Sequence, residues 1–276
     1  SLTLVYLPHL DYNLQRLGPS DPAISDDIRA IDVEAGKLIV AAKASGAEIV
    51  VLSEYAITNV DRPIHINRIL REHGLVDTRM EISGWETLDY GSSRAFAVAD
   101  HQVAHIYIQR PEDVPHVAEI LQRVDGVEHI LDRNAQKEFG IDHERSGELV
   151  VASDRRSWFT YYFWHDDAVA PDYARCVDIH RKPGYDPAEL FVDPTLKFPK
   201  LKVARQLAKK RLGFRYYMDV IGLDPGIVKG SHGRLPDPGT EERDGAVFIS
   251  SSRSIEQDSI AMTDAKQLML NLQFST

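Results

Sequence analysis

The chain has 276 residues, of which 43% are hydrophobic and 27% are charged, which is ordinary for a soluble globular protein. Its formal net charge of −10 argues against non-specific nucleic-acid binding, because such binding depends on a basic surface. No run of about 20 apolar residues occurs, so no membrane partner is expected, and the single cysteine, Cys176, excludes an internal disulfide and favours the cytoplasm.

The first hundred residues are expected to form part of an α/β core. Residues 2–7 are a near-continuous apolar run, typical of a strand that is covered on both faces. A helix follows over 26–45, with Ser25 as its cap, and a second apolar strand occupies 49–52. A strand, a helix and a strand in this order predict a β-α-β unit and therefore a parallel sheet.

The remaining pattern predicts a small α+β insert between two parts of the core. A helical pattern over 61–74 leads into it, with Pro63 in the first turn. The expected elements around and within the insert are strands at 95–99, 103–108 and 127–131 and helices at 112–124 and 134–139. Beyond it we expect strands at 148–152 and 158–163, an irregular region at 171–199, a basic helix at 200–212 and a strand at 246–250. The predicted divisions are therefore 1–99 (core), 100–145 (insert) and 146–276 (remainder of the core).

Two carboxylates come directly after the two apolar strands of the first part. Asp11 lies in the loop past the first strand, and Glu54 lies just past the second. Ligands of α/β sheets bind outside the carboxyl ends of the strands, and carboxylates are good ligands of hard metals. The local pattern also fits a turn-forming Asp11 and a capping or surface Glu54.

A histidine between small residues, His232 in Gly230-Ser231-His232-Gly233, is the third candidate. Glycines let the backbone bend and approach a ligand closely, so this imidazole could bind a metal or an oxyanion, although an ordinary loop histidine fits as well. Three loops that are far apart in sequence thus predict one metal site at a sheet edge, built from Asp11, Glu54 and His232.

Other polar groups are less specific. His101 and His105 would share one face of a predicted strand, but without a third ligand the pattern favours polar residues at a domain junction. Asp178 and His180 open a polar stretch that suits an anionic substrate or a metal-supporting role, and equally suits a solvated loop. Cys176 is interpreted as a structural thiol. The absence of G-x-S-x-G, P-loop and G-x-G-x-x-G motifs argues against α/β-hydrolases, P-loop nucleotidases and dinucleotide enzymes.

In chain order, these segments resemble the type I phosphodiesterase/nucleotide pyrophosphatase branch of the alkaline phosphatase superfamily. The family motif D-x-x-G-H-x-x-G-P corresponds to Asp11–Pro19, S-D-H-G-M corresponds to Ser53–Ile57, and G-x-H-G corresponds to Gly230–Gly233. The resemblance implies an α/β fold with an alkaline-phosphatase-like, mostly parallel sheet flanked by helices. It also implies a divalent metal (Zn, Mn or Mg) held by Asp11, Glu54 and His232.

Two positions match the family by place but not by chemistry. Gln15 replaces a histidine, and Glu54-Tyr55 replaces Asp-His. A glutamine carbonyl suits hard cations better than zinc, and a phenol ligates only when it is deprotonated. The site is therefore expected to favour magnesium, manganese or a single metal. Groups that could support it or the substrate are His9, Asp178 and His180.

The resemblance implies a metal-dependent hydrolase of phosphodiester or pyrophosphate bonds in a small, nucleotide-like phosphorylated substrate. The family uses an upstream Thr or Ser nucleophile, and nothing before Asp11 can supply it. We therefore expect a C-terminal fragment that is inactive by itself, with the nucleophile upstream of Ser1. Two alternatives stay open: a non-catalytic ligand-binding relative with a degenerate metal site, and a phosphomonoester or sulfate-ester hydrolase of the same superfamily. The sequence does not indicate the oligomeric state.

Overall fold

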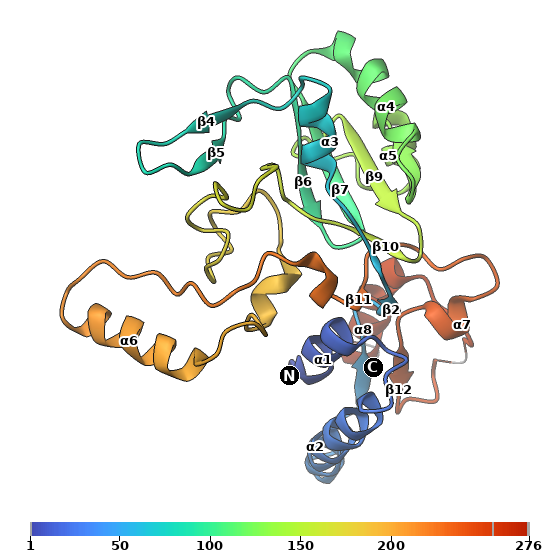
Figure 1. Cartoon of the computed structure of the whole chain (residues 1–276). Coiled ribbons are helices and arrows are strands. Elements are labelled where there is room, and N and C mark those ends of the chain that lie inside the picture. The colour runs from blue at the N-terminus through green and yellow to red at the C-terminus, as the bar shows by residue number, and fades with distance from the viewer. Residues whose placement is uncertain (1, 256, 275–276) are drawn as a thin grey trace. The chain divides into compact units, whose positions relative to one another are not determined.

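The computed structural model describes residues 2–255 and 257–274 and divides into two compact units (Figure 1). Unit 1 comprises the residues up to Thr58 together with those from Leu235 onward, and unit 2 comprises Asn59–Arg234. The short strand β2 (Thr58–Asn59) lies at the boundary. The divisions predicted at residues 100 and 145 stay predictions.

Unit 1 is mostly helical. Its elements are α1 (His9–Leu17), α2 (Ile24–Ala44), β1 (Val50–Leu52), α7 (Glu241–Asp244), β12 (Phe248–Ser250), the 3-10 turn η4 (Met262–Asp264) and α8 (Ala265–Phe274). The predicted helix after Ser25 is confirmed as α2, but it begins after Ala23 without a side-chain cap. Ser25 is therefore not the cap, because it already lies in the first turn.

The predicted strand over residues 2–7 is wrong. These residues form irregular chain, and their apolar side chains are exposed, with Leu4 at 79%. A strand needs a neighbour that completes its backbone hydrogen bonds, and within unit 1 β1 pairs antiparallel with β12, Val51 opposite Ile249. The β-α-β unit is therefore absent from the described residues, and the mostly parallel sheet is not confirmed. β1 itself is half-exposed rather than buried.

Unit 2 holds the larger set of elements. Its strands are β3 (Arg62–Ile64), β4 (Thr78–Met80), β5 (Glu86–Leu88), β6 (Ala95–Asp100), β7 (Val103–Ile108), β8 (Val127–Leu131), β9 (Leu149–Ser153), β10 (Ser157–Phe159) and β11 (Gly230–Ser231). Its α-helices are α3 (Ile66–Glu72), α4 (Val114–Gln122), α5 (Arg133–Glu138) and α6 (Pro199–Arg211), with 3-10 turns η1 (Pro111–Asp113), η2 (Pro187–Leu190) and η3 (Pro225–Ile227).

Two predicted boundaries in unit 2 need correction. The helix expected over 61–74 begins only at Ile66, because Pro63 lies in β3, which pairs parallel with β10. A residue before proline is disfavoured in the α conformation, which agrees with the extended backbone of Arg62 in β3. The strand expected over 158–163 ends at Phe159, and the residues that follow pack as irregular chain in the core.

A four-stranded sheet in the order β6-β7-β9-β8 organises unit 2, and all its pairings are antiparallel. Alternate residues of β6 and β7 face one core, for example Ala97 opposite Ile106. Helices α3 and α4 contribute to that core, and α4 and α5 lie beside the sheet in Figure 1. The other face carries Phe96 stacked on Tyr107, with ring centroids 5.4 Å apart.

The outer edge of β6 is covered by side-chain and main-chain partners. The buried Asn67 of α3 donates its amide to the Ala97 carbonyl at 2.9 Å and accepts from the Ala97 N–H at 2.7 Å. Further along, Gly184 bridges to Ala99, and the Tyr185 N–H donates to the Ala99 carbonyl at 2.8 Å. These contacts occupy backbone groups that an exposed edge strand would leave unpaired.

Candidate functional site

The first part of the candidate site lies on α1, so the prediction that Asp11 lies in a loop after a strand is wrong. This helix begins after Pro8 and ends where Gly18, at φ 82°, donates its N–H to the Leu14 carbonyl. Asp11 and Gln15 are four residues apart, so they share one face of the helix. Gln15 is 1% exposed, and its Oε1 has no hydrogen-bond partner among the described residues. A buried acceptor without a donor is costly, so this carbonyl would be stabilised by a ligand that it can coordinate.

Tyr55 contacts the same carboxylate. Its Oη donates to Asp11 Oδ1 at 2.9 Å, although the two residues are far apart in sequence. Burial, followed by the hydrogen bond to Asp11, raises the pKa of Tyr55 well above its ordinary value. The phenol therefore keeps its proton and acts in this structure as a hydrogen-bond donor that orients Asp11.

Glu54 and His9 lie nearby in the chain but make different contacts. Glu54 is exposed in the bend after β1, and the preceding Ser53 anchors that bend through two hydrogen bonds with Val247, each 2.9 Å long. His9 approaches Asp27 of α2, with 3.7 Å between Nε2 and Oδ1. The negative charge of Glu54 contributes to the raised pKa of Tyr55.

The second part of the candidate site lies in unit 2. His232 follows β11 and packs its ring on that of His101, with centroids 3.9 Å apart and an interplanar angle of 33°. His101 is 4% exposed, and its Nδ1 lies 3.3 Å from Ser231 Oγ. Burial, together with the charge of His232, lowers the pKa of His101 to about 3. The ring of Tyr185 lies on His101 as well, at 4.9 Å.

The prediction that His101 and His105 share one face of a strand is wrong. His105 belongs to β7, where its Nδ1 accepts from the Gly147 N–H at 3.1 Å. His101 instead occupies the connection between β6 and β7. The missed signal is a two-residue connection between well-formed strands, where a glycine or asparagine is usual and this chain has His101-Gln102.

The polar stretch that begins at Asp178 forms ion pairs within unit 2. Asp178 pairs with Arg181, 3.8 Å between Oδ2 and Nη1, while His180 is exposed. The buried Lys182 lies 2.9 Å from Asp186 and 2.5 Å from Glu189. A supporting role of Asp178 and His180 in catalysis stays a prediction.

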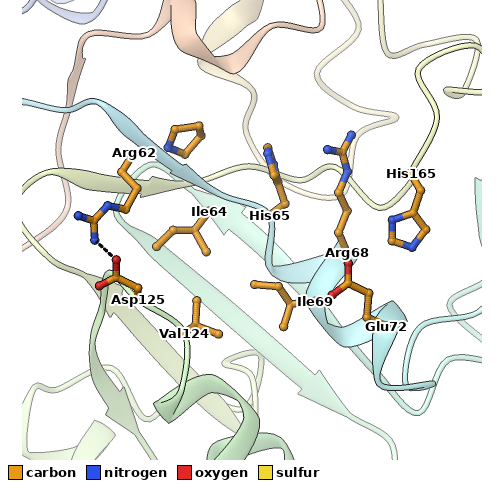
Figure 2. A pocket seen from close by; sticks show the side chains of 10 residues that line it. Arg62, Ile64, His65, Arg68, Ile69, Glu72, Val124, Asp125 and His165 are labelled. Atoms are coloured by element: carbon orange, nitrogen blue, oxygen red, sulfur yellow. Dashed lines mark ion pairs between the residues drawn. The ribbon is translucent and has the colours of Figure 1, made fainter.

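Unit 2 also contains a cleft of about 490 Å³ between β3, α3 and the Val124–Asp125 turn. Figure 2 shows Arg62 reaching Asp125, at 2.8 Å, on one side, and His65, Arg68 and His165 on the other. Arg68 donates Nε to the Trp164 carbonyl at 2.5 Å. Both guanidinium groups of the cleft therefore already have partners among the described residues.

Cys176 is buried and free, in agreement with a structural thiol. Its Sγ lies 3.4 Å from the Asp172 carbonyl oxygen. Burial raises the pKa of this thiol to about 11, so the thiolate is scarce at neutral pH.

The predicted ligands fall into both units: Asp11 and Glu54 belong to unit 1, and His232 belongs to unit 2. Their convergence on one ion stays a prediction. Across residues 2–255 and 257–274, no three His, Cys, Asp or Glu side chains are grouped so as to hold a metal ion. In the same residues, none of the helices has the length and apolar character needed to span a membrane.

The family model for type I phosphodiesterase / nucleotide pyrophosphatase matches residues 1–186, so the chain belongs to this family. The predicted family resemblance is thereby confirmed. No curated protein matches the chain.

Several solved structures are similar to part of the chain. Murine ectonucleotide pyrophosphatase / phosphodiesterase 5 is 18% identical with a TM-score of 0.40 over 54% of this chain and 36% of its own. An inactive variant of that protein, in complex with AMP, is 17% identical with a TM-score of 0.41, over 56% of this chain and 38% of its own. Phosphonoacetate hydrolase from Sinorhizobium meliloti 1021, in complex with phosphonoacetate, is 18% identical with a TM-score of 0.38, over 54% of this chain and 36% of its own. The chain thus spans little more than a third of these proteins.

Proposed function

We propose that this chain supplies metal-binding residues to a hydrolase of phosphodiester or pyrophosphate bonds in small, nucleotide-like substrates. Membership of the family supports the reaction class. The observation that carries the proposal is the face of α1, where Asp11 lies one turn from a buried Gln15 carbonyl that has no donor among the described residues.

The residues of unit 1 fit a hard divalent cation better than they fit zinc. Asp11 offers a carboxylate and Gln15 an amide carbonyl, the oxygen donors that magnesium and manganese prefer. Tyr55 does not fit as a ligand, since its hydroxyl donates to Asp11. Its role in the proposal is to fix the orientation of that carboxylate, as outer hydrogen-bond partners of metal ligands commonly do.

When bound, a divalent ion supplies positive charge that stabilises the oxygens of a phosphoryl group during its transfer. In the proposal, Asp11, Gln15 and Glu54 would supply metal ligands from unit 1, and His232 would supply one from unit 2.

Gln15→Leu is the sharpest test, because it should move metal affinity and stability in opposite directions. It removes an unpartnered buried carbonyl at nearly constant volume, so we expect thermal stability to hold or rise. Loss of a ligand should weaken Mn²⁺ binding by about tenfold or more. Isothermal titration with Mn²⁺, Mg²⁺ and Zn²⁺ and a thermal melt measure the two effects. Gln15→His should shift the preference toward Zn²⁺.

Activity separates the alternatives. The natural full-length protein should hydrolyse bis(4-nitrophenyl) phosphate with Mn²⁺ or Mg²⁺. Asp11→Asn should abolish this metal-dependent activity. Metal binding without turnover of any ester would favour the non-catalytic relative, whereas turnover only of monoesters or sulfate esters would favour the other branch of the superfamily. Unchanged Mn²⁺ affinity in both Asp11→Asn and Gln15→Leu would contradict the proposed site.

A further inference from the structure

The turn between β6 and β7 has an unusual residue at its first position. Asp100 pairs with Val103, so His101 and Gln102 form a two-residue connection. His101 has φ 56°, and it is the one non-glycine residue with positive φ in the described part of the chain. Two-residue hairpins with positive φ at this position favour glycine. A histidine here therefore works against local backbone preference, and contacts of its side chain must offset that cost.

The imidazole of His101 makes contacts that offset this backbone cost. It lies against the His232 ring at 3.9 Å between centroids, and its Nδ1 is 3.3 Å from Ser231 Oγ, although 130 residues separate His101 from Ser231 in sequence. Tyr185 covers His101 at 4.9 Å. With only 4% of its surface exposed, His101 is held in one place and gives the His232 ring a rigid surface to rest on.

The backbone of the same turn holds the Gly230–Arg234 loop. The Gln102 N–H donates to the His232 carbonyl at 2.9 Å, and the Arg234 N–H donates to Gln102 Oε1 at 3.4 Å. Gln102 is itself anchored, because its Nε2 donates to the Ser157 carbonyl at 3.1 Å. Gly233 has φ 113°, and a Cβ there would come within 3.3 Å of a Val103 methyl group. The second glycine of the G-x-H-G segment is thus favoured by its φ angle and by the close approach of this turn.

On the basis of the metal-binding role proposed for His232, we propose that His101 is a positioning residue that fixes the His232 imidazole in the orientation needed to bind a divalent cation. Metal-ligating histidines generally depend on neighbours that set the ring orientation. Here the neighbour is a stacked ring on a hairpin turn, and the contact lies entirely within unit 2. Removing the ring should therefore loosen His232 without unfolding the sheet.

His101→Gly tests the proposal because it relaxes the turn while it removes the ring. We expect its melting temperature to equal or exceed that of the parent. We expect its Mn²⁺ affinity to fall by about tenfold or more. In metal-free protein, the NMR signal of the His232 Hε1 proton, assigned through its loss in His232→Gln, should move toward the value of free histidine. His101→Phe keeps a flat ring and should stay within about threefold of the parent affinity.

A matched control and three outcomes decide the result. His105→Gln changes the other histidine of the hairpin, which contacts Gly147, and should leave the His232 signal and the Mn²⁺ affinity unchanged. If His101→Gly keeps the parent His232 signal and affinity while His232→Gln loses affinity, the positioning role is overturned. If His232→Gln itself binds Mn²⁺ like the parent, the proposed metal role of His232 fails instead. Weaker Mn²⁺ binding with an unchanged melting temperature supports the positioning role.

Discussion

His65 is held as a neutral imidazole in the cleft of unit 2. Its Nδ1 lies 2.7 Å from Thr160 Oγ1, and its ring stacks on Tyr162 at 5.6 Å. Burial lowers the pKa of His65 to about 4, the positive charge of Arg68 adds to this, and Asp167 opposes it. The same histidine in an unfolded chain has a pKa of about 6.5.

We therefore expect acid to destabilise the protein through His65. Between pH 6.5 and 4 the unfolded chain binds a proton at this position that the folded chain does not, so the free energy of unfolding falls as pH falls and levels off below pH 4. The contribution is roughly 3 kcal/mol at most. Urea unfolding at several pH values, compared with His65→Gln, measures it. If the free energies of unfolding of the parent and of His65→Gln change in parallel from pH 7 to pH 4, the role of His65 is contradicted.

At the residue scale, sequence spacing relates side chains only where the element itself has been predicted. The sequence predicts Asp11 in a loop after a strand, but it lies in α1, and only there does a spacing of four residues place it on one face with Gln15. The contacts of Asp11 with Tyr55 and of His232 with His101 join segments that only the folded chain brings together. No local pattern in a single sequence contains those distances.

At the scale of elements, the β6 edge depends on one glycine. Gly184 has φ 120°, and a Cβ there would collide with the Ala99 carbonyl oxygen. Gly140, after α5, has φ 66° but open space around it, with nothing within 4 Å of a Cβ. The two positions separate the cost of the backbone conformation from the cost of the collision.

We expect Gly184→Ala to destabilise unit 2 by about 3 kcal/mol or more, because the sheet edge must shift. Gly140→Ala should cost only about 1–2 kcal/mol, the penalty of a left-handed backbone. Chemical denaturation of both variants provides the comparison. Equal losses would mean that the contact of Gly184 with β6 adds nothing beyond its φ angle.

The prediction of elements succeeded where periodicity and a packing partner coincide. The strands of β6, β7, β8 and β9 and the long helix α2 follow their apolar patterns. The run over residues 2–7 has an equally apolar pattern and yet forms no strand, because pairing decides whether an extended segment becomes one. Pro63 marks a strand rather than a helical first turn for a similar reason, since β10 lies beside it.

At the scale of the molecule, the two units differ in how much apolar surface they bury. Among the described residues, Ile24 is the buried hydrophobic residue of unit 1, whereas the rest, from Val60 to Val228, lie in unit 2. Helix α2 spans 21 residues and leaves Val33 57% and Val40 69% exposed. Without tertiary packing, helices of this length are marginally stable in water.

Native-state hydrogen exchange should therefore divide the chain. Amides of β6, β7 and β9 should exchange with the free energy of global unfolding, while those of α2 should show protection factors on the order of 10–100. Mass spectrometry of peptic fragments over a time course resolves the two classes. Protection of α2 equal to that of the sheet would show that unit 1 is stabilised by contacts beyond its own core.

The single cysteine of the chain, Cys176, allows local opening of unit 2 to be measured by alkylation. Cys176 is enclosed and keeps its proton at neutral pH, so iodoacetamide can react only after the surrounding segment has come apart. Because the sequence contains a single cysteine, each alkylated molecule records one such event, and no second thiol can form an internal crosslink that would obscure it. The rate of labelling therefore measures how often the folded state opens around Cys176.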